Sequence, residues 1–185
     1  MAKSATAVTL RRAHPLEGRA AGGVNVSLQP AEPAFRLALR APEKSLSALS
    51  KALGVTLPAK PKSSASKGSR SALWLGPDEW LVIDTGTADP NADLAKSRML
   101  HSAVDVSHRN CAILVTGKAA ADVLNAGCPL DLSLTAFPAG AATRTVLGKI
   151  EVVLMRTGAD EFRVECWRSF ADYAFTYLAD AATGL

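Results

Sequence analysis

The sequence predicts an α+β protein made of two interleaved ferredoxin-like units of the βαββαβ type. Residues 35–40 alternate between apolar and other side chains, which is typical of a half-buried strand. Residues 76–78 form a Gly-Pro-Asp turn between two apolar runs, as expected of a β-hairpin. Residues 111–116 are almost continuously apolar, which indicates a strand covered on both faces. Helical patterns between these strands complete the α+β class.

The first unit is expected to follow the order β-α-β-β-α-β from residue 35 onward. Its first helix begins at Pro42 and ends before Gly54, with three leucines on one face. The Asp-Pro pair at 89–90 predicts the start of its second helix, because proline is favoured at the first helical position. The remaining strands of this unit are expected at residues 71–75, 79–84 and 102–106.

The second unit has the order β-α-β-β-β-α and lacks one strand of the repeat. We expect the missing strand to come from residues 24–28, which would interleave the two units. Ser169 and Asp172 have the spacing of a capping box for the final helix. The other elements are expected at residues 111–116, 118–125, 143–147, 150–155 and 162–167.

These elements predict a single domain over residues 24–185, with halves at 24–107 and 108–185. A chain of 185 residues buries enough surface to fold without a metal or a disulfide. Residues 1–23 show no sustained periodicity and are expected to form a flexible arm. Residues 58–69 contain no apolar side chain larger than alanine apart from proline, so we expect a flexible surface loop there.

Composition and charge argue against several classes of protein. No apolar run approaches the roughly 20 residues of a membrane span, and the three cysteines are widely spaced, so we expect a cytoplasmic protein. The net charge of +4 divides into 12 Lys and Arg against 3 Asp and Glu over residues 1–70, and 9 against 14 over residues 71–185. Such a division is compatible with nucleic-acid binding, but the basic residues have no aromatic neighbours, which disfavours that function.

The sequence displays no complete catalytic motif. It contains no dinucleotide-binding glycine motif, no P-loop and no nucleophile elbow. The histidines and cysteines lack metal-ligand spacing, and Cys111 and Cys166 lie on strand patterns that place them in the core. We therefore predict no catalytic, cofactor-binding or metal-binding residue in this chain.

One cluster nevertheless concentrates chemical groups: Asp105, Ser107, His108 and Arg109. In one hypothesis, Asp105 orients His108 as a general base, and Arg109 holds a carboxylate such as the glutamate of folate. In the other, a strand ends here, Ser107 caps the turn, and His108 and Arg109 face solvent or a partner protein. Strand alternation places His108 beside neither Asp105 nor Ser107, which favours the second hypothesis.

A second candidate for a partner interface lies at the end of the last predicted strand. Trp167 falls on the face opposite Phe162, Val164 and Cys166, so it is a candidate exposed anchor for another subunit. We include the adjacent Arg168 in this candidate interface.

Three segments resemble one known family. They read Cys-Trp-Arg-Ser-Phe-Ala at 166–171, Val-Asp-Val-Ser-His-Arg-Asn at 104–110 and Leu-Asn-Ala-Gly-Cys-Pro-Leu-Asp-Leu at 124–132. Together they resemble the gamma subunit of heterotetrameric sarcosine oxidase, from about Leu73 to Leu178. Asp-Val-Ser-His-Arg is also similar to folate-dependent aminomethyltransferases such as the glycine cleavage T-protein. The resemblance implies a T-protein-like fold in truncated form.

The resemblance also implies a function. In that family, alpha, beta, gamma and delta subunits oxidise sarcosine to glycine, reduce oxygen to hydrogen peroxide and deliver the methyl group to tetrahydrofolate as 5,10-methylenetetrahydrofolate. FAD, FMN, NAD and tetrahydrofolate lie in or between the larger subunits, and the gamma chain is a non-catalytic accessory subunit. Two alternatives remain open: a free-standing folate-binding or aminomethyltransferase-like protein, and a small nucleic-acid-binding module.

Overall fold

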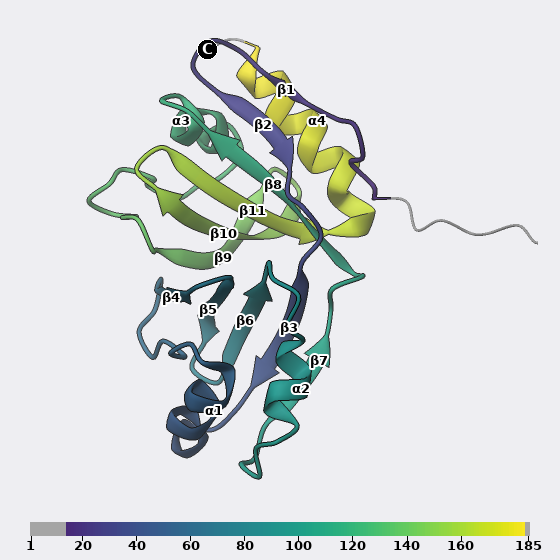
Figure 1. Cartoon of the computed structure of the whole chain (residues 1–185). Helices are drawn as coiled ribbons and strands as arrows, with labels where there is room; N and C mark the ends of the chain where they lie inside the picture. Colours follow the sequence, from purple (N-terminus) through teal and green to yellow (C-terminus); the bar gives the residue numbers. More distant parts are fainter. Residues whose placement is uncertain (1–13, 184–185) are drawn as a thin grey trace, which may run out of the picture.

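A computed structural model of the chain describes residues 14–183 and contains two stacked β-sheets with helices on their outer sides (Figure 1). One sheet has five strands in the order β4-β5-β6-β3-β7, and the other has six in the order β1-β2-β8-β11-β10-β9. All neighbouring strands in both sheets are antiparallel. The result is a layered α+β protein whose two sheets face each other.

The five-stranded sheet comes from the first half of the chain and carries two short helices. Along the chain its elements follow the predicted order β-α-β-β-α-β, with the additional edge strand β4 after the first helix. Their bounds are β3 Phe35–Arg40, α1 Leu46–Leu53, β4 Ser64–Lys67, β5 Arg70–Gly76, β6 Glu79–Asp84, α2 Pro90–Leu94 and β7 Ser102–Asp105, with a 3-10 turn, η1, at Glu43–Ser45 before α1.

The six-stranded sheet combines the C-terminal half with two strands from the N-terminal region. Strand β2 pairs with β8, so this sheet takes a strand from near residues 24–28, as predicted. Strands β9, β10 and β11 pair consecutively, so the last three strands form a meander. The bounds are β1 Ala21–Gly22, β2 Ser27–Pro30, β8 Asn110–Thr116, α3 Ala120–Asn125, β9 Ala142–Leu147, β10 Ile150–Gly158, β11 Glu161–Trp167, η2 Arg168–Phe170 and α4 Ala171–Ala182.

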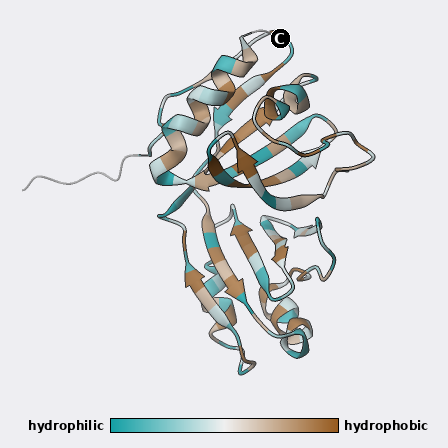
Figure 2. Ribbon diagram, turned by 180° about the vertical axis from the view of Figure 1, so that it is seen from behind, coloured by the Kyte–Doolittle hydropathy of each residue, from teal (hydrophilic) through white to brown (hydrophobic). Residues whose placement is uncertain are grey.

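Three apolar clusters fill the spaces between the layers. The largest lies between the six-stranded sheet and helices α3 and α4, and a second lies between the five-stranded sheet and helices α1 and α2. The third joins the two sheets and contains side chains from both, such as Leu81 of β6 and Val153 of β10. Hydrophobic residues accordingly follow the strands of both sheets (Figure 2). The strands β10 and β11 are buried on both faces because one face meets helices and the other meets a sheet.

Two segments that we expected to be flexible contain regular structure. Within 58–69, strand β4 pairs with β5 across a Gly-Ser turn in which Gly68 has a φ of +60°, and the Ser66 and Ser71 hydroxyl oxygens lie 2.8 Å apart. Backbone pairing and this hydroxyl contact order a strand that has no large apolar residue. Of the expected arm 1–23, residues 1–13 lie outside the described residues.

The described part of that arm packs on the final helix. The side chain of Leu16 is fully buried in the largest cluster, and strand β1 pairs with β2. Arg19 pairs with Asp172 and lies 4.4 Å from the ring centroid of Phe175. The predicted capping box is therefore wrong: α4 begins at Ala171 after a 3-10 turn without a side-chain cap, and the Asp172 carboxylate contacts Arg19 instead.

Candidate functional site

A buried ion network joins the two sheets. Strand alternation turns Arg36 of β3 and both Arg163 and Glu165 of β11 toward the opposing sheet. Arg36 Nε donates a hydrogen bond to one oxygen of Glu165 at 2.6 Å, and Arg163 Nε donates to the other at 2.8 Å. All three side chains are buried. One carboxylate therefore serves two guanidinium groups, and such a network is stable only while its hydrogen bonds are made.

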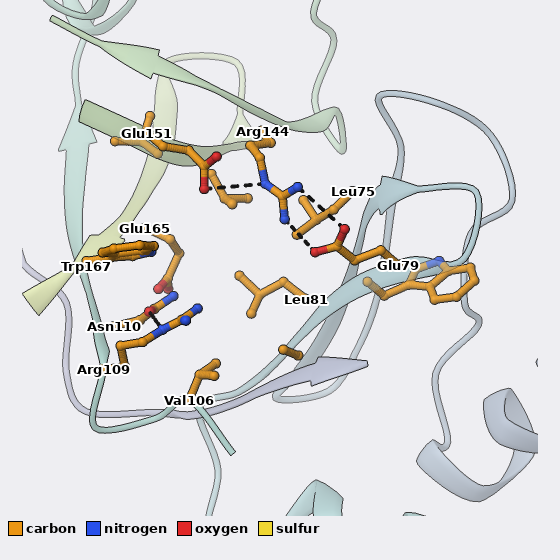
Figure 3. A pocket seen from close by; sticks show the side chains of 14 residues that line it. Leu75, Glu79, Leu81, Val106, Arg109, Asn110, Arg144, Glu151, Glu165 and Trp167 are labelled. Carbon is orange, nitrogen blue, oxygen red and sulfur yellow. Dashed lines mark hydrogen bonds and ion pairs between the residues drawn. The ribbon is translucent and has the colours of Figure 1, made fainter. Parts of the chain in front are cut away.

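A narrow cleft lies beside this network and is shown in Figure 3. Arg144 of β9 donates to Glu79 of β6 at 2.6 Å, across the boundary between the sheets, and also pairs with Glu151 at 3.6 Å. Glu165 and Trp167 line another part of the same cleft (Figure 3). Its volume is about 60 Å³, well below the roughly 300 Å³ of a typical small-molecule site. We interpret this cleft as a seam between the sheets.

The cluster predicted around Asp105 forms a structural turn. Ser107 donates both its main-chain N–H, at 2.8 Å, and its hydroxyl, at 2.5 Å, to the Asp105 carboxylate. The same hydroxyl accepts the main-chain N–H of Arg36 at 2.8 Å, and Val106 N–H donates to the Arg36 carbonyl. Ser107 thus continues the pairing of β3 beyond the end of β7, which agrees with the capping interpretation. The side chain of His108 is exposed.

An exposed aromatic surface lies where β11 ends, and we define it by Arg109, Trp167 and Phe170. The rings of Trp167 and Phe170 stack with their centroids 5.8 Å apart, and the Arg109 guanidinium lies 5.2 Å from the Trp167 ring centroid. Trp167 is 43% exposed and Phe170 is 38% exposed. The Arg168 main-chain N–H donates to the Arg109 carbonyl at 2.7 Å, which fixes the two segments side by side.

The structure thus brings three predicted interface residues together: Arg109, Trp167 and Arg168. Sequence reasoning missed Phe170, although its position three residues after Trp167 was visible. The 3-10 turn η2 presents both rings on the same side, and a helix beginning at Ser169 was expected instead. Exposed, stacked aromatic rings beside an arginine are enriched in protein–protein interfaces.

The remaining reactive groups occupy core positions. Cys111 and Cys166 lie directly opposite each other on β8 and β11, with 3.7 Å between their sulfur atoms, and both are buried as predicted. The hydrogen bond between the two thiols, together with burial, raises the pKa of Cys166 well above its usual value.

Over residues 14–183, no group of three or more His, Cys, Asp or Glu residues is placed to hold a metal ion. No helix within that range is long and apolar enough to span a membrane.

The fold defines the class of protein. The glycine cleavage system aminomethyltransferase T from Bartonella henselae has the same fold, with a TM-score of 0.60 at 14% identity over 89% of this chain and 47% of that one. The chain is therefore an α+β protein with part of the aminomethyltransferase fold. It belongs to the sarcosine oxidase gamma subunit family, whose model matches residues 39–184.

Individual relatives agree with this assignment. Sarcosine oxidase subunit gamma from Corynebacterium sp. (strain P-1) is 34% identical over 91% of this chain and 86% of the relative. The corresponding subunit from strain U-96 is 35% identical over 87% and 81%. A chain of the heterotetrameric sarcosine oxidase from Corynebacterium sp. U-96, solved with pyrrole 2-carboxylate, has a TM-score of 0.85 at 32% identity over 94% of this chain and 95% of that one.

These comparisons confirm the resemblance and correct its extent. We expected it to run from about Leu73 to Leu178, but the family match begins at residue 39 and includes the segment 58–69. Strand β3 and helix α1 contain none of the three motifs that carry the resemblance, which lie at residues 104–110, 124–132 and 166–171.

Proposed function

We propose that this chain is the gamma subunit of a heterotetrameric, flavin-dependent sarcosine oxidase, in which it is a non-catalytic accessory subunit. The observation that carries the proposal is the likeness to a chain of the solved heterotetramer, at a TM-score of 0.85 over nearly the whole of both chains. At 32% identity, this likeness extends from the fold to the sequence.

We assign the contact with partner subunits to the aromatic surface. Three aromatic side chains are exposed, Trp167, Phe170 and Tyr173, and all lie within seven consecutive residues; Trp167 and Phe170 stack on each other, whereas Tyr173 packs beside Tyr177. The other seven aromatic residues are buried or partly buried. An aromatic group left outside the core at one place is typical of a docking surface, because its burial against a partner removes apolar area from water. Asp105, Ser107 and His108 border this surface through the turn that leads to Arg109.

The finer features follow from the same proposal. The partners are the alpha, beta and delta subunits, and the assembly converts sarcosine to glycine in the cytoplasm. FAD, FMN, NAD and tetrahydrofolate are held in or between the larger subunits. The lack of a phosphate-binding glycine motif in this chain is compatible with that placement. The two sheets correspond to two ferredoxin-like units, the second altered by its strand meander.

Co-expression tests this function. The tagged chain, produced together with the alpha, beta and delta subunits, is expected to elute from size exclusion as a four-subunit complex that oxidises sarcosine. The isolated chain is expected to be colourless and inactive. Stoichiometric flavin on the isolated chain, or elution apart from the other three subunits, would contradict the proposal. Tight binding of tetrahydrofolate by the isolated chain would favour the folate-binding alternative suggested by the aminomethyltransferase fold.

A further inference from the structure

Two buried cysteines form a close pair at one end of the six-stranded sheet. Cys111 of β8 and Cys166 of β11 are direct partners across antiparallel strands, and their sulfur atoms lie 3.7 Å apart. Both side chains belong to the largest apolar cluster. The third cysteine is Cys128, whose sulfur lies 3.8 Å from the hydroxyl oxygen of Thr145. All three thiols are free, so the chain contains one thiol pair and one separate thiol for comparison.

The backbone positions of this pair suit a disulfide bond. Residues directly opposite each other on antiparallel strands have Cα atoms about 4.5–5.5 Å apart. The Cα atoms of disulfide-bonded cysteines are about 4.4–6.8 Å apart, so strands β8 and β11 need no change of register. The sulfur atoms would approach from 3.7 Å to about 2.05 Å. Shared between the two side chains, this is a movement of about 1 Å or less for each sulfur, which side-chain rotation supplies.

The surroundings make the two thiols chemically different. The hydrogen bond with Cys166 lowers the pKa of Cys111, and this effect exceeds that of burial, which raises it. The charge of Glu165 also raises the pKa of Cys111, whereas the charges of Arg36 and Arg168 lower it. The same hydrogen bond, together with burial, raises the pKa of Cys166. Because the thiolate is the nucleophile, Cys111 is the member of the pair that reacts first with an oxidant.

A recess in the surface leads to Cys111. It has a volume of about 160 Å³, and Cys111 lines it together with residues such as His14 and His108, whereas Cys166 does not line it. The Cys111 side chain is only 2% exposed, so this recess is its route to small molecules. Hydrogen peroxide has only two non-hydrogen atoms and fits such a space. The recess therefore reaches the same thiol whose pKa is lowered.

We propose that Cys111 and Cys166 are a redox-active pair that hydrogen peroxide converts into an intramolecular disulfide. The Cys111 thiolate attacks one peroxide oxygen: an S–O bond forms, the O–O bond breaks, and the leaving hydroxide takes up a proton to become water. Cys166 then attacks the sulfur of the resulting sulfenic acid: the S–S bond forms, the S–O bond breaks, and a second water leaves with the Cys166 proton. The two thiols lose two electrons in total, and these electrons reduce the peroxide to water.

The pair lies directly beside the aromatic surface. Cys166 precedes Trp167, and Cys111 follows Arg109 by two residues, so a disulfide would tie together the two strands that carry this surface. Disulfides in a reducing compartment are usually transient and redox-sensing. The chemistry needs only the pair and the oxidant and does not rest on the proposed function. That function adds a local source of the oxidant, because the assembly would reduce oxygen to hydrogen peroxide.

Peptide mapping of the full chain tests the disulfide. The reduced chain is treated with hydrogen peroxide, the excess is removed with catalase, and the chain is unfolded in urea and alkylated with iodoacetamide. We expect the peptides of Cys111 and Cys166 to be recovered linked to each other and to separate in dithiothreitol, while Cys128 is alkylated as in the untreated chain. Full alkylation of Cys111 and Cys166 after the treatment would overturn the inference. Oxidation of Cys128 at the same rate as the pair would overturn it as well.

Serine variants test the order of the two steps. Cys166→Ser should stop at the sulfenic acid of Cys111, which is detected as its dimedone adduct. Cys111→Ser should leave Cys166 to react at least about tenfold more slowly, because each unit of pKa changes the thiolate fraction about tenfold. Cys128→Ser is the matched control and should form the disulfide at the rate of the unaltered chain. Equal dimedone labelling of the Cys111→Ser and Cys166→Ser variants would overturn the role of Cys111 as the attacking thiol.

Discussion

One face of strand β11 carries side chains in two different environments, one buried between the sheets and one exposed at the edge of the molecule. Arg163 and Glu165 point into the boundary between the sheets, where they are buried and ion-paired. Trp167, two residues further along that face, is 43% exposed and stacks on Phe170. Because side chains alternate along a strand, one face of β11 runs from the interior of the molecule to its edge. The difference predicts that the stability of the fold and the proposed docking are separable along a single strand.

The largest expected effect is at the buried end of this comparison. Glu165→Gln removes the carboxylate that Arg36 and Arg163 share, and so takes this counter-charge away from two buried guanidinium groups. Breaking a buried pair in this way costs about 3–5 kcal/mol of unfolding free energy, measured by urea denaturation of the isolated chain.

Glu151→Gln is the matched control on the neighbouring strand. Its carboxylate is half exposed and its contact with Arg144 is 3.6 Å long, so we expect a change within about 0.5 kcal/mol. Equal, small losses for the two variants would show that the network at Glu165 does not hold the sheets together.

A second buried carboxylate gives the first sheet a dependence on pH. Burial raises the pKa of Asp84, but hydrogen bonds from the Ser69 hydroxyl, the Gly86 N–H and Arg70 overcome this and leave it lowered. A lowered pKa means that Asp84 stabilises the fold above about pH 4, and that this contribution is lost as the pH falls through the folded-state pKa.

Asp84→Asn tests that dependence. We expect a loss of about 2 kcal/mol at pH 7, the scale of hydrogen bonds to a charged group, and a loss that shrinks as the pH falls through the folded-state pKa of Asp84. Chemical denaturation at several pH values gives the two curves. If they ran parallel across the whole range, Asp84 would not be the source of the dependence.

The ion pair at the rim of the cleft is expected to matter less than either buried carboxylate. Arg144 is 37% exposed, so solvent screens its 2.6 Å contact with Glu79. Arg144→Ala should cost about 0.5–1 kcal/mol in low salt and less in 1 M sodium chloride. If Arg144→Ala lowered the free energy of unfolding as much as Glu165→Gln does, and salt did not change this effect, the Arg144–Glu79 pair would behave as a buried ion pair.

The sequence predicted most of the strands, the borrowed strand β2 and the outward position of Trp167, because each depends on local periodicity or on counting strands. It did not predict the pairing of Arg36 with Glu165, since 129 residues separate them and strand periodicity says nothing about which sheets face each other. Strand β4 and the docking of Leu16 were missed for a related reason. Strand β4 depends on backbone pairing with β5, and the burial of Leu16 depends on helix α4, which lies far away in the sequence.

The proposed docking through Trp167 can be measured as the affinity of the isolated chain for a complex of the alpha, beta and delta subunits, compared with that of the Trp167→Ala variant. Removal of an interface hot spot costs 2 kcal/mol or more, so we expect the dissociation constant to rise about thirtyfold or more. The unfolding free energy of the same variant should change by no more than about 0.5 kcal/mol, because Trp167 lies outside the three apolar clusters. Unchanged affinity together with a large loss of stability would contradict the separation of docking from folding along β11.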